Sequence, residues 1–303
     1  MTDISVDLAG VTLRNPVIPA SGTFEVTGMG DRFFDPSELG AVINKTVFLD
    51  PRPGNPPPRI YETPCGMLNS IGIPSEGADL FIEKQLPELK SIGVPVIVSV
   101  AESSLDRFRL IAEKIEETGM ADLLELDLSC PNVAHDAQWS EDPKLLNDVV
   151  SAVKEAVTLP VIAKLSPMVP DIGYMGKTAE DAGADALSCI NTFRGIAIDI
   201  ETRTPVLGNV VGGLSGPAIH AAAVYAVYSV YKAVSIPVIG IGGISTWRDA
   251  VEFMMAGASA VGVGMYNFVN PRVMPEIIQG IRSWSEERGL LSLRDIIGAA
   301  HRK

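Results

Sequence analysis

The strongest constraint on the fold is a short apolar run that recurs eight times along the 303-residue chain. Most intervals between these runs contain an amphipathic stretch with helical spacing. Near-continuous apolar strands that alternate with helices are typical of a parallel sheet covered by helices. The sequence therefore predicts an α/β protein with parallel strands at residues 17–20, 41–47, 94–101, 123–130, 161–166, 186–192, 238–244 and 260–265.

The number of these units favours one parallel architecture over another. Eight units in a chain of this length favour a (β/α)8 TIM barrel, formed by a single domain of residues 1–303. An open doubly wound sheet is the alternative. Residues 3–13 predict a short hairpin around Ala9 and Gly10, ahead of the barrel. Helices are predicted at residues 103–117, 143–156, 172–182, 215–234 and 246–256.

Two connections that follow predicted strands are unusually long. Residues 48–77 are rich in proline and glycine, and residues 193–214 contain Thr204-Pro205 and Gly212-Gly213. Loops that follow barrel strands lie at the C-terminal mouth, where barrel enzymes place their active sites. Long loops in compact domains are usually functional or disordered. We therefore expect a site at this mouth.

Composition argues against several classes of protein. The 37 acidic residues outnumber the 24 basic ones, giving a net charge of −13 and no basic stripe for nucleic acid. No signal peptide is evident, and no apolar run is long enough to span a membrane. Cys65, Cys130 and Cys189 lack the spacing of a disulfide framework, a zinc site or an iron–sulfur cluster. We expect a cytoplasmic protein without a bound metal.

Residues 123–132 carry the most distinctive candidate group. Apolar residues alternate with Glu125 and Asp127, and Ser-Cys-Pro-Asn (129–132) then ends the strand, because proline donates no ladder hydrogen bond. The Cys130 thiol is therefore expected at the mouth. It is either reactive or a small buried side chain, which is the commoner role of cysteine. Cys65 and Cys189 are predicted to be structural.

Glycines and lysines near the strand ends indicate an anionic ligand. Several glycines occur in the segments Ile239-Gly-Ile-Gly-Gly-Ile-Ser245 and Val261-Gly-Val-Gly-Met265. Backbone without side chains at these adjacent strand ends can bind a phosphate, or can simply permit tight packing. Lys45 and Lys164 lie on predicted strands, and an inward lysine needs an anionic or electron-rich partner. Lys45 could instead point outward, and Lys164 could form a Schiff base.

Amides accompany the thiol in the mouth loops. Asn69, Asn132 and Asn191 each follow a predicted strand or lie in a mouth loop, and Thr192 adds a hydroxyl. A single asparagine in a turn often has only a conformational role. Together these groups suggest a small, flat substrate that forms hydrogen bonds.

Several motifs make the chain similar to the class 1 dihydroorotate dehydrogenases. They are Asn-Lys-Thr (44–46), Gly-Asn-Pro-Pro-Pro-Arg (54–59), Asn-Ser-Ile-Gly (69–72), Ser-Cys-Pro-Asn (129–132) and Gly-Gly-Ile (242–244). Ile60-Tyr-Glu-Thr, Ala197-Ile-Asp-Ile-Glu-Thr-Arg and Gly212-Gly-Leu-Ser-Gly-Pro217 resemble the class 1B catalytic subunit most. The resemblance covers essentially the whole chain. It implies an FMN-containing barrel that oxidises (S)-dihydroorotate to orotate in pyrimidine biosynthesis.

The resemblance also implies roles for individual residues. Cys130 would be the base that removes a proton from dihydroorotate C5, while hydride leaves C6 for flavin N5. Lys164 would face the N1/O2 edge of the flavin. The other implied FMN-binding residues are Ala20, Ser21, Gly22, Lys45, Thr46, Ser99, Asp127, Ile190, Gly216, Gly242, Gly243, Gly264 and Met265. The implied substrate-binding residues are Lys45, Asn69, Ser70, Ile71, Gly72, Ile73, Asp127, Asn132, Asn191 and Thr192.

Electrons destined for NAD would have to leave through a separate protein. The chain has no G-x-G-x-x-G motif after an early strand, and too few cysteines to hold a cluster alone. The resemblance implies a partner subunit that carries FAD and a 2Fe–2S cluster. It also implies a heterotetramer built around a catalytic homodimer.

Four places depart from the family's usual pattern. At the positions of Asp127 and Ser99 the family usually has Asn, and at the position of Met265 it usually has Thr. Where this chain has Phe193-Arg194, the family usually has two apolar residues. An ionised Asp127 donates no hydrogen bond and repels an anionic substrate. Either Asp127 is protonated or paired with Arg194 or Lys45, or the substrate is another dihydropyrimidine or an enone. The alternatives from other classes are a Schiff-base aldolase or lyase that uses Lys164, and a non-catalytic binding barrel.

Overall fold

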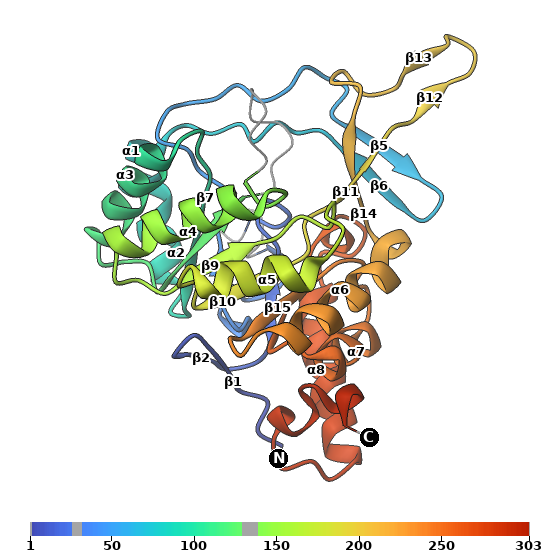
Figure 1. The fold of residues 1–303 in the computed structure, drawn as a ribbon. Coiled ribbons are helices and arrows are strands. Elements are labelled where there is room, and N and C mark those ends of the chain that lie inside the picture. Colours follow the sequence, from blue (N-terminus) through green and yellow to red (C-terminus); the bar gives the residue numbers. More distant parts are fainter. Residues whose placement is uncertain (1, 26–31, 129–138, 303) are drawn as a thin grey trace.

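The computed structural model describes residues 2–25, 32–128 and 139–302 (Figure 1). Within these residues, eight strands form one parallel sheet in the order β3-β16-β15-β10-β9-β8-β7-β4. The first and last strands of that order meet, because the Gly40 N–H donates to the Val17 carbonyl at 2.9 Å. The sheet is therefore a barrel, and the predicted (β/α)8 fold is confirmed. Its strands are β3 (Val17–Pro19), β4 (Val42–Ile43), β7 (Val96–Val100), β8 (Leu123–Asp127), β9 (Val161–Lys164), β10 (Ala186–Cys189), β15 (Val238–Ile241) and β16 (Ala260–Val263).

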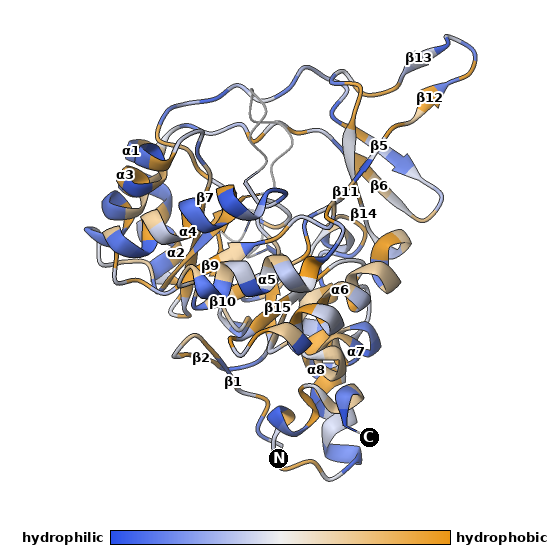
Figure 2. Ribbon diagram, in the orientation of Figure 1, coloured by the Kyte–Doolittle hydropathy of each residue, from blue (hydrophilic) through white to orange (hydrophobic). Residues whose placement is uncertain are grey.

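Helices surround the barrel and bury one apolar face each. In α4, for example, Leu146, Val149, Val150 and Val153 are buried at helical spacing. Figure 2 shows hydrophilic residues along much of α3 and α4, whereas α6 is largely apolar. The helices are α1 (Ala78–Leu80), the π-helical turn η3 (Phe81–Gln85), α2 (Leu86–Ser91), α3 (Leu105–Glu116), α4 (Pro143–Ala156), α5 (Ile172–Asp181), α6 (His220–Ala233), α7 (Trp247–Ala256) and α8 (Val273–Glu287). Short 3-10 turns complete the set: η2 (Pro36–Glu38), η4 (Pro217–Ile219), η5 (Met265–Phe268), η6 (Leu293–Ile296) and η7 (Ala299–His301).

Side-chain caps fix where several helices begin. The Asp142 carboxylate accepts from the backbone N–H groups of Lys144 and Leu145, directly ahead of Pro143 at the first helical position. Thr246 and Asp249 form a reciprocal capping box at the start of α7. Five helices match the predicted segments closely, although α6 begins later than predicted because Ser215 ends β14 and Pro217–Ile219 form the 3-10 turn η4.

The two long connections form a second sheet above the mouth of the barrel. Strands β5 (Ile60–Thr63) and β6 (Gly66–Asn69) come from the first connection, and β11 (Phe193–Gly195) and β14 (Gly212–Ser215) from the second. They pair antiparallel in the order β11-β14-β6-β5. A small ribbon of β12 (Ile198–Asp199) and β13 (Thr204–Pro205) projects beyond it (Figure 1). The two long connections thus lie at the mouth as predicted, and they contain short strands that the sequence analysis did not predict.

The predicted N-terminal hairpin is confirmed as β1 (Val6–Leu8) and β2 (Val11–Leu13). It lies at the end of the barrel away from the β5–β6 hairpin (Figure 1). None of the helices in the described part of the chain is long and apolar enough to cross a lipid bilayer. Residues 2–25, 32–128 and 139–302 also contain no cluster of three or more side chains suited to holding a metal ion.

Candidate active site

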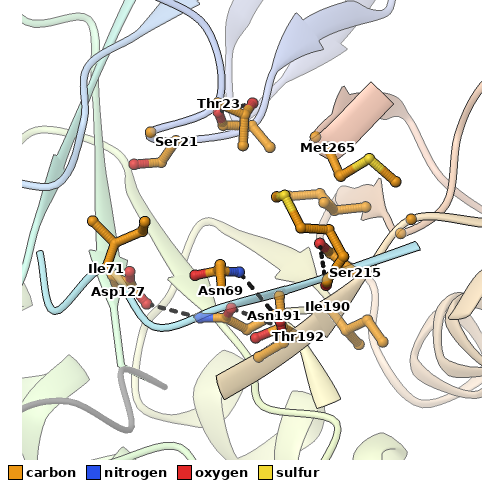
Figure 3. A pocket seen from close by; sticks show the side chains of 18 of the residues that line it. Ser21, Thr23, Asn69, Ile71, Asp127, Ile190, Asn191, Thr192, Ser215 and Met265 are labelled. Carbon is orange, nitrogen blue, oxygen red and sulfur yellow. Dashed lines mark hydrogen bonds between the residues drawn. The ribbon is translucent and has the colours of Figure 1, made fainter. Parts of the chain in front are cut away.

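A cavity of about 410 Å³ lies at the C-terminal mouth of the barrel, beneath the antiparallel sheet. Its volume is in the range of small-molecule sites. Figure 3 shows Asp127 and Met265 on opposite sides of the cavity, with Asn69 between them. Most of the predicted site residues meet here: Ala20, Ser21, Gly22, Lys45, Thr46, Asn69, Ile71, Gly72, Ile73, Asp127, Lys164, Ile190, Asn191, Thr192, Gly216, Gly242, Gly243, Gly264 and Met265.

Four predicted site residues are not among those that line the cavity. Ser70 and Ser99 are fully buried behind its wall. Cys130 and Asn132 lie outside the described residues. Conversely, the cavity is also lined by Thr23, Ile60, Met67, Gly213, Ser215, Ile219, Ile241 and Phe268, which the sequence interpretation did not assign. Of these, Gly213 and Ser215 belong to the Gly212–Pro217 motif, so a signal for them was present.

One side of the cavity is made of backbone without side chains. Gly216, Gly242 and Gly243 have φ values of +93°, +142° and +68°, a region that favours glycine. A Cβ at Gly243 would lie 2.8 Å from the Gly216 carbonyl oxygen and from His220 Cβ. Gly216 directly precedes η4 and α6, whereas Gly242 and Gly243 follow β15 and precede α7. The N–H groups at the N-terminal ends of helices favour negative charge. This side of the cavity therefore fits a phosphate group.

Lys45 brings a cation to the cavity wall. Lys45 is an exposed side chain of the cavity wall, and partial desolvation of its ammonium group lowers its pKa below the usual lysine range. The positive charge of Arg59 lowers this pKa further, while Glu25 opposes the shift. Lys45 lines the cavity even though its side chain is exposed.

Lys164 lies deeper in the barrel and is only 7% exposed. Its Nζ is 3.6 Å from Oε1 of Glu125, which is itself buried. Lysine is rarely buried without such a partner. Lys164 thus presents a paired ammonium group to the floor of the cavity.

Asp127 ends β8 and is 8% exposed. Its Oδ1 accepts from Nδ2 of Asn191 at 3.2 Å, and its Oδ2 lies 3.4 Å from the Thr46 hydroxyl oxygen. Arg194, one of the two cations expected to pair with Asp127, donates to both carboxylate oxygens of Glu141 at 2.7 Å. The carboxylate therefore lies in a cluster of polar side chains on the cavity wall.

Two amide side chains, Asn69 and Asn191, also line the cavity. Asn69 Nδ2 donates to the Gly213 carbonyl at 3.3 Å, which ties β6 to β14. Asn191 Oδ1 accepts from the Thr192 backbone N–H at 2.8 Å. These contacts orient the amides before a ligand binds, as a site for a planar polar ring requires.

The other cysteines differ in their surroundings. Cys189 is buried at the end of β10, and burial raises its pKa well above the usual thiol range, so this thiol is unreactive. Its predicted structural role fits that burial. Cys65 is exposed in the turn between β5 and β6, so within this chain it does not fill a core.

Comparisons with known proteins agree with this geometry. Residues 3–284 match the family described as Dihydroorotate dehydrogenase. The chain is 46% identical over 298 residues to "Dihydroorotate dehydrogenase B (NAD(+)), catalytic subunit" from a Thermoanaerobacter species, covering 98% of each chain. It is 47% identical over 301 residues to the protein of that name from Geobacter sulfurreducens, again covering 98% of each chain. For that from Carboxydothermus hydrogenoformans the identity is 44% over 304 residues, covering 99% of this chain and 98% of the relative. The chain therefore belongs to the dihydroorotate dehydrogenase family.

Proposed function

We propose that this protein is the FMN-containing catalytic subunit of a dihydroorotate dehydrogenase, oxidising (S)-dihydroorotate to orotate in pyrimidine biosynthesis. The observation that carries the proposal is a single cavity that combines two features. One is the exposed backbone of Gly216, Gly242 and Gly243, which we call the glycine cradle, and the other is a set of oriented amides. Lys164 lies on the cavity floor between them. A flavin phosphate fits the cradle, and a pyrimidine ring fits the amides. The names of the relatives support the same substrate.

Residues of the chain would hold and orient both ligands. FMN, when bound, would accept the hydride that leaves C6 of dihydroorotate. Gly216, Gly242 and Gly243 would bind its phosphate through backbone N–H groups, and Lys164 would place positive charge at the flavin edge that gains electron density on reduction. Asn69 and Asn191 would hold the pyrimidine ring. Cys130 would take the C5 proton, a role proposed from its sequence motif.

The direct test is turnover of dihydroorotate by the purified chain with an artificial dye as electron acceptor. We expect orotate to form in step with dye reduction. NAD reduction is expected only when an FAD and 2Fe–2S partner subunit is added, since we propose that electrons leave through such a partner. Relatives of this chain carry the term catalytic subunit in their names, which supports a partner, and we further propose a catalytic homodimer. Absence of orotate formation with any acceptor would reject the proposal.

Asp127 supports a second candidate substrate class. A carboxylate accepts hydrogen bonds but repels an anion, so the cavity could instead take an uncharged dihydropyrimidine or an enone. A variant that removes the charge of Asp127 and keeps the shape of its side chain distinguishes the two substrate classes.

Asp127→Asn is expected to tighten orotate binding by about tenfold, because it removes one negative charge close to the ligand. Asn191 can still donate to the new carbonyl oxygen, and the new NH2 group then faces the Thr46 hydroxyl oxygen. Titration of bound orotate measures the effect, and an uncharged dihydropyrimidine should show a much smaller change. Weaker orotate binding in the variant, together with loss of turnover of the uncharged compound, would favour the second substrate class.

The lowered pKa of Lys45 predicts a pH dependence. The ammonium form exists below this pKa, so affinity for the orotate carboxylate should be full at neutral pH and should fall as the pH rises through it. Because the pKa is lowered, this loss should begin at a lower pH than for a free lysine. Lys45→Arg should abolish the alkaline loss, since arginine stays protonated. An identical alkaline limb in the variant would show that another group controls it.

A Schiff-base enzyme fits the cavity less well. A nucleophilic lysine must lose its proton, whereas Lys164 lies in an ion pair with Glu125. Borohydride treatment with a carbonyl substrate is therefore expected to leave Lys164 unmodified.

A further inference from the structure

A buried carboxylate lies beneath the cavity without lining it. Glu125 is on β8, two residues before Asp127, and is 2% exposed. Its Oε1 accepts from the Ser99 hydroxyl and its Oε2 from the Ser188 hydroxyl, both at 3.0 Å. The two serines belong to β7 and β10, so strands on both sides of β8 and β9 hold this one side chain in place.

The same carboxylate reaches Lys164, which does line the cavity. Glu125 Oε1 is 3.6 Å from Lys164 Nζ, and both side chains are more than nine-tenths buried. Strand register places Lys164 opposite Asp127, one step nearer the mouth than Glu125. Glu125 therefore supports the ammonium group from below.

Stability alone does not explain a buried ion pair at this place. Taking two charges out of water costs several kcal/mol per ion, and apolar residues of similar volume often serve a core equally well. Buried charge pairs next to a cavity are instead typical of functional sites. Glu125 differs from an isolated buried charge because both of its oxygens have hydroxyl donors as well as the lysine.

Hydroxyl groups extend this arrangement to the other side of the cavity. The Ser99 hydroxyl has one proton, which it donates to Glu125, so at 2.9 Å from Thr46 Oγ1 it acts as the acceptor. The single Thr46 proton is then directed to Ser99 rather than to Asp127 Oδ2, which is farther away at 3.4 Å. Thr46 itself lines the cavity. The carboxylate thus fixes the direction of a hydrogen-bond chain that ends at the cavity wall.

We propose that Glu125 is a positioning residue that keeps the Lys164 ammonium group charged and fixed at the floor of the cavity, where it stabilises negative charge on the bound ligand. The inference rests on the flavin site proposed above. Ser99 and Ser188 orient Glu125. This role explains why Ser99 is fully buried and does not line the cavity.

Sulfite binding to the FMN-loaded protein tests this role without turnover. The sulfur lone pair forms a bond to flavin N5, and the ring takes up the resulting negative charge, which a nearby cation stabilises. Glu125→Gln keeps the side-chain shape and removes the charge. We expect about tenfold weaker sulfite binding, the size of effect typical of coupled buried groups.

A matched control and a double-mutant cycle separate positioning from general damage. Glu102 is equally buried and ion-paired to Arg107, but it does not line the cavity, so Glu102→Gln should leave sulfite affinity unchanged. In a Lys164→Gln background, Glu125→Gln should have no further effect, because its influence acts through the lysine. Ser188→Ala retains the charge and should weaken sulfite binding less, which keeps the test available if Glu125→Gln does not fold.

Two results would overturn the inference. The first is unchanged or tighter sulfite binding in Glu125→Gln, or in Ser188→Ala if only that variant folds. The second is a loss of sulfite affinity on adding Glu125→Gln to Lys164→Gln that is as large as the loss caused by Glu125→Gln in the wild-type chain. A wild-type chain that binds no FMN would instead reject the proposed function and the inference together, so the two failures are distinguishable.

Discussion

Replacing Cys130 by alanine is expected to lower kcat for dihydroorotate by about 10²–10⁴-fold, the usual contribution of a positioned general base. The thiol lies in the Ser-Cys-Pro-Asn motif that follows β8, and β8 ends at the cavity wall. We propose that this thiol takes the C5 proton as the hydride leaves, and the variant lacks it. Stopped-flow measurement of flavin reduction by dihydroorotate isolates this step from reoxidation.

Binding should survive this substitution, because the base acts on the reacting atom. FMN content and orotate affinity are therefore expected to stay near wild-type values in Cys130→Ala. Cys65→Ala is the matched control: it removes an exposed thiol from the β5–β6 turn and should leave the reduction rate unchanged. A reduction rate in Cys130→Ala within a few-fold of wild type would remove Cys130 from its role.

Gly243→Ala is expected to weaken FMN binding by about 100-fold. The added Cβ would lie 2.8 Å from the Gly216 carbonyl oxygen and from His220 Cβ, closer than real Cβ atoms approach such neighbours. Alanine is also strained at a φ of +68°. Because Gly216 and His220 border the glycine cradle, relief of the contact must move the backbone that would bind the phosphate. Quenching of FMN fluorescence on titration measures the affinity.

A second glycine separates backbone strain from loss of the site. Gly93 has a φ of +81°, but an added Cβ would meet nothing within 4 Å, and Gly93 does not line the cavity. Gly93→Ala should therefore lower thermal stability slightly while FMN affinity stays unchanged. Equal FMN affinities in Gly243→Ala and wild type would show that the phosphate is not bound at this cradle.

The barrel could be predicted because its signals are local. Each strand is a short apolar run, and the capping residues Asp142 and Thr246 lie next to the helices that they begin. The predicted strand boundaries differ from the observed ones by a few residues, because several predicted runs continue past the sheet into the mouth segments, as residues 41–47 do beyond β4 (Val42–Ile43). The count of eight units was enough to favour closure over an open sheet.

The antiparallel sheet could not be predicted in the same way. Its central pair joins β6 to β14, and Gly213 lies opposite Asn69 across a long stretch of sequence. Two of the four residues of β14 are glycines, which have low strand propensity. Pairing between distant segments depends on the barrel that brings them together, so the segments resemble loops when read in isolation.

Most of the candidate site could be placed from the strand ends and from the family resemblance. Lys164 was expected at the cavity, but its pairing with Glu125 was not, because Glu125 looked like an alternating polar residue on a strand. Arg194 was expected near Asp127 and is instead paired with Glu141, a residue that precedes α4 and is distant in sequence. Side-chain partners of this kind depend on three-dimensional packing rather than on spacing.

The most direct test of the proposed function is the visible spectrum of the purified protein, recorded without oxygen before and after addition of dihydroorotate. We predict a yellow protein with the absorption of oxidised flavin, which dihydroorotate bleaches with formation of one orotate per flavin. A colourless protein, or a bound flavin that dithionite reduces but dihydroorotate leaves oxidised, would contradict the account.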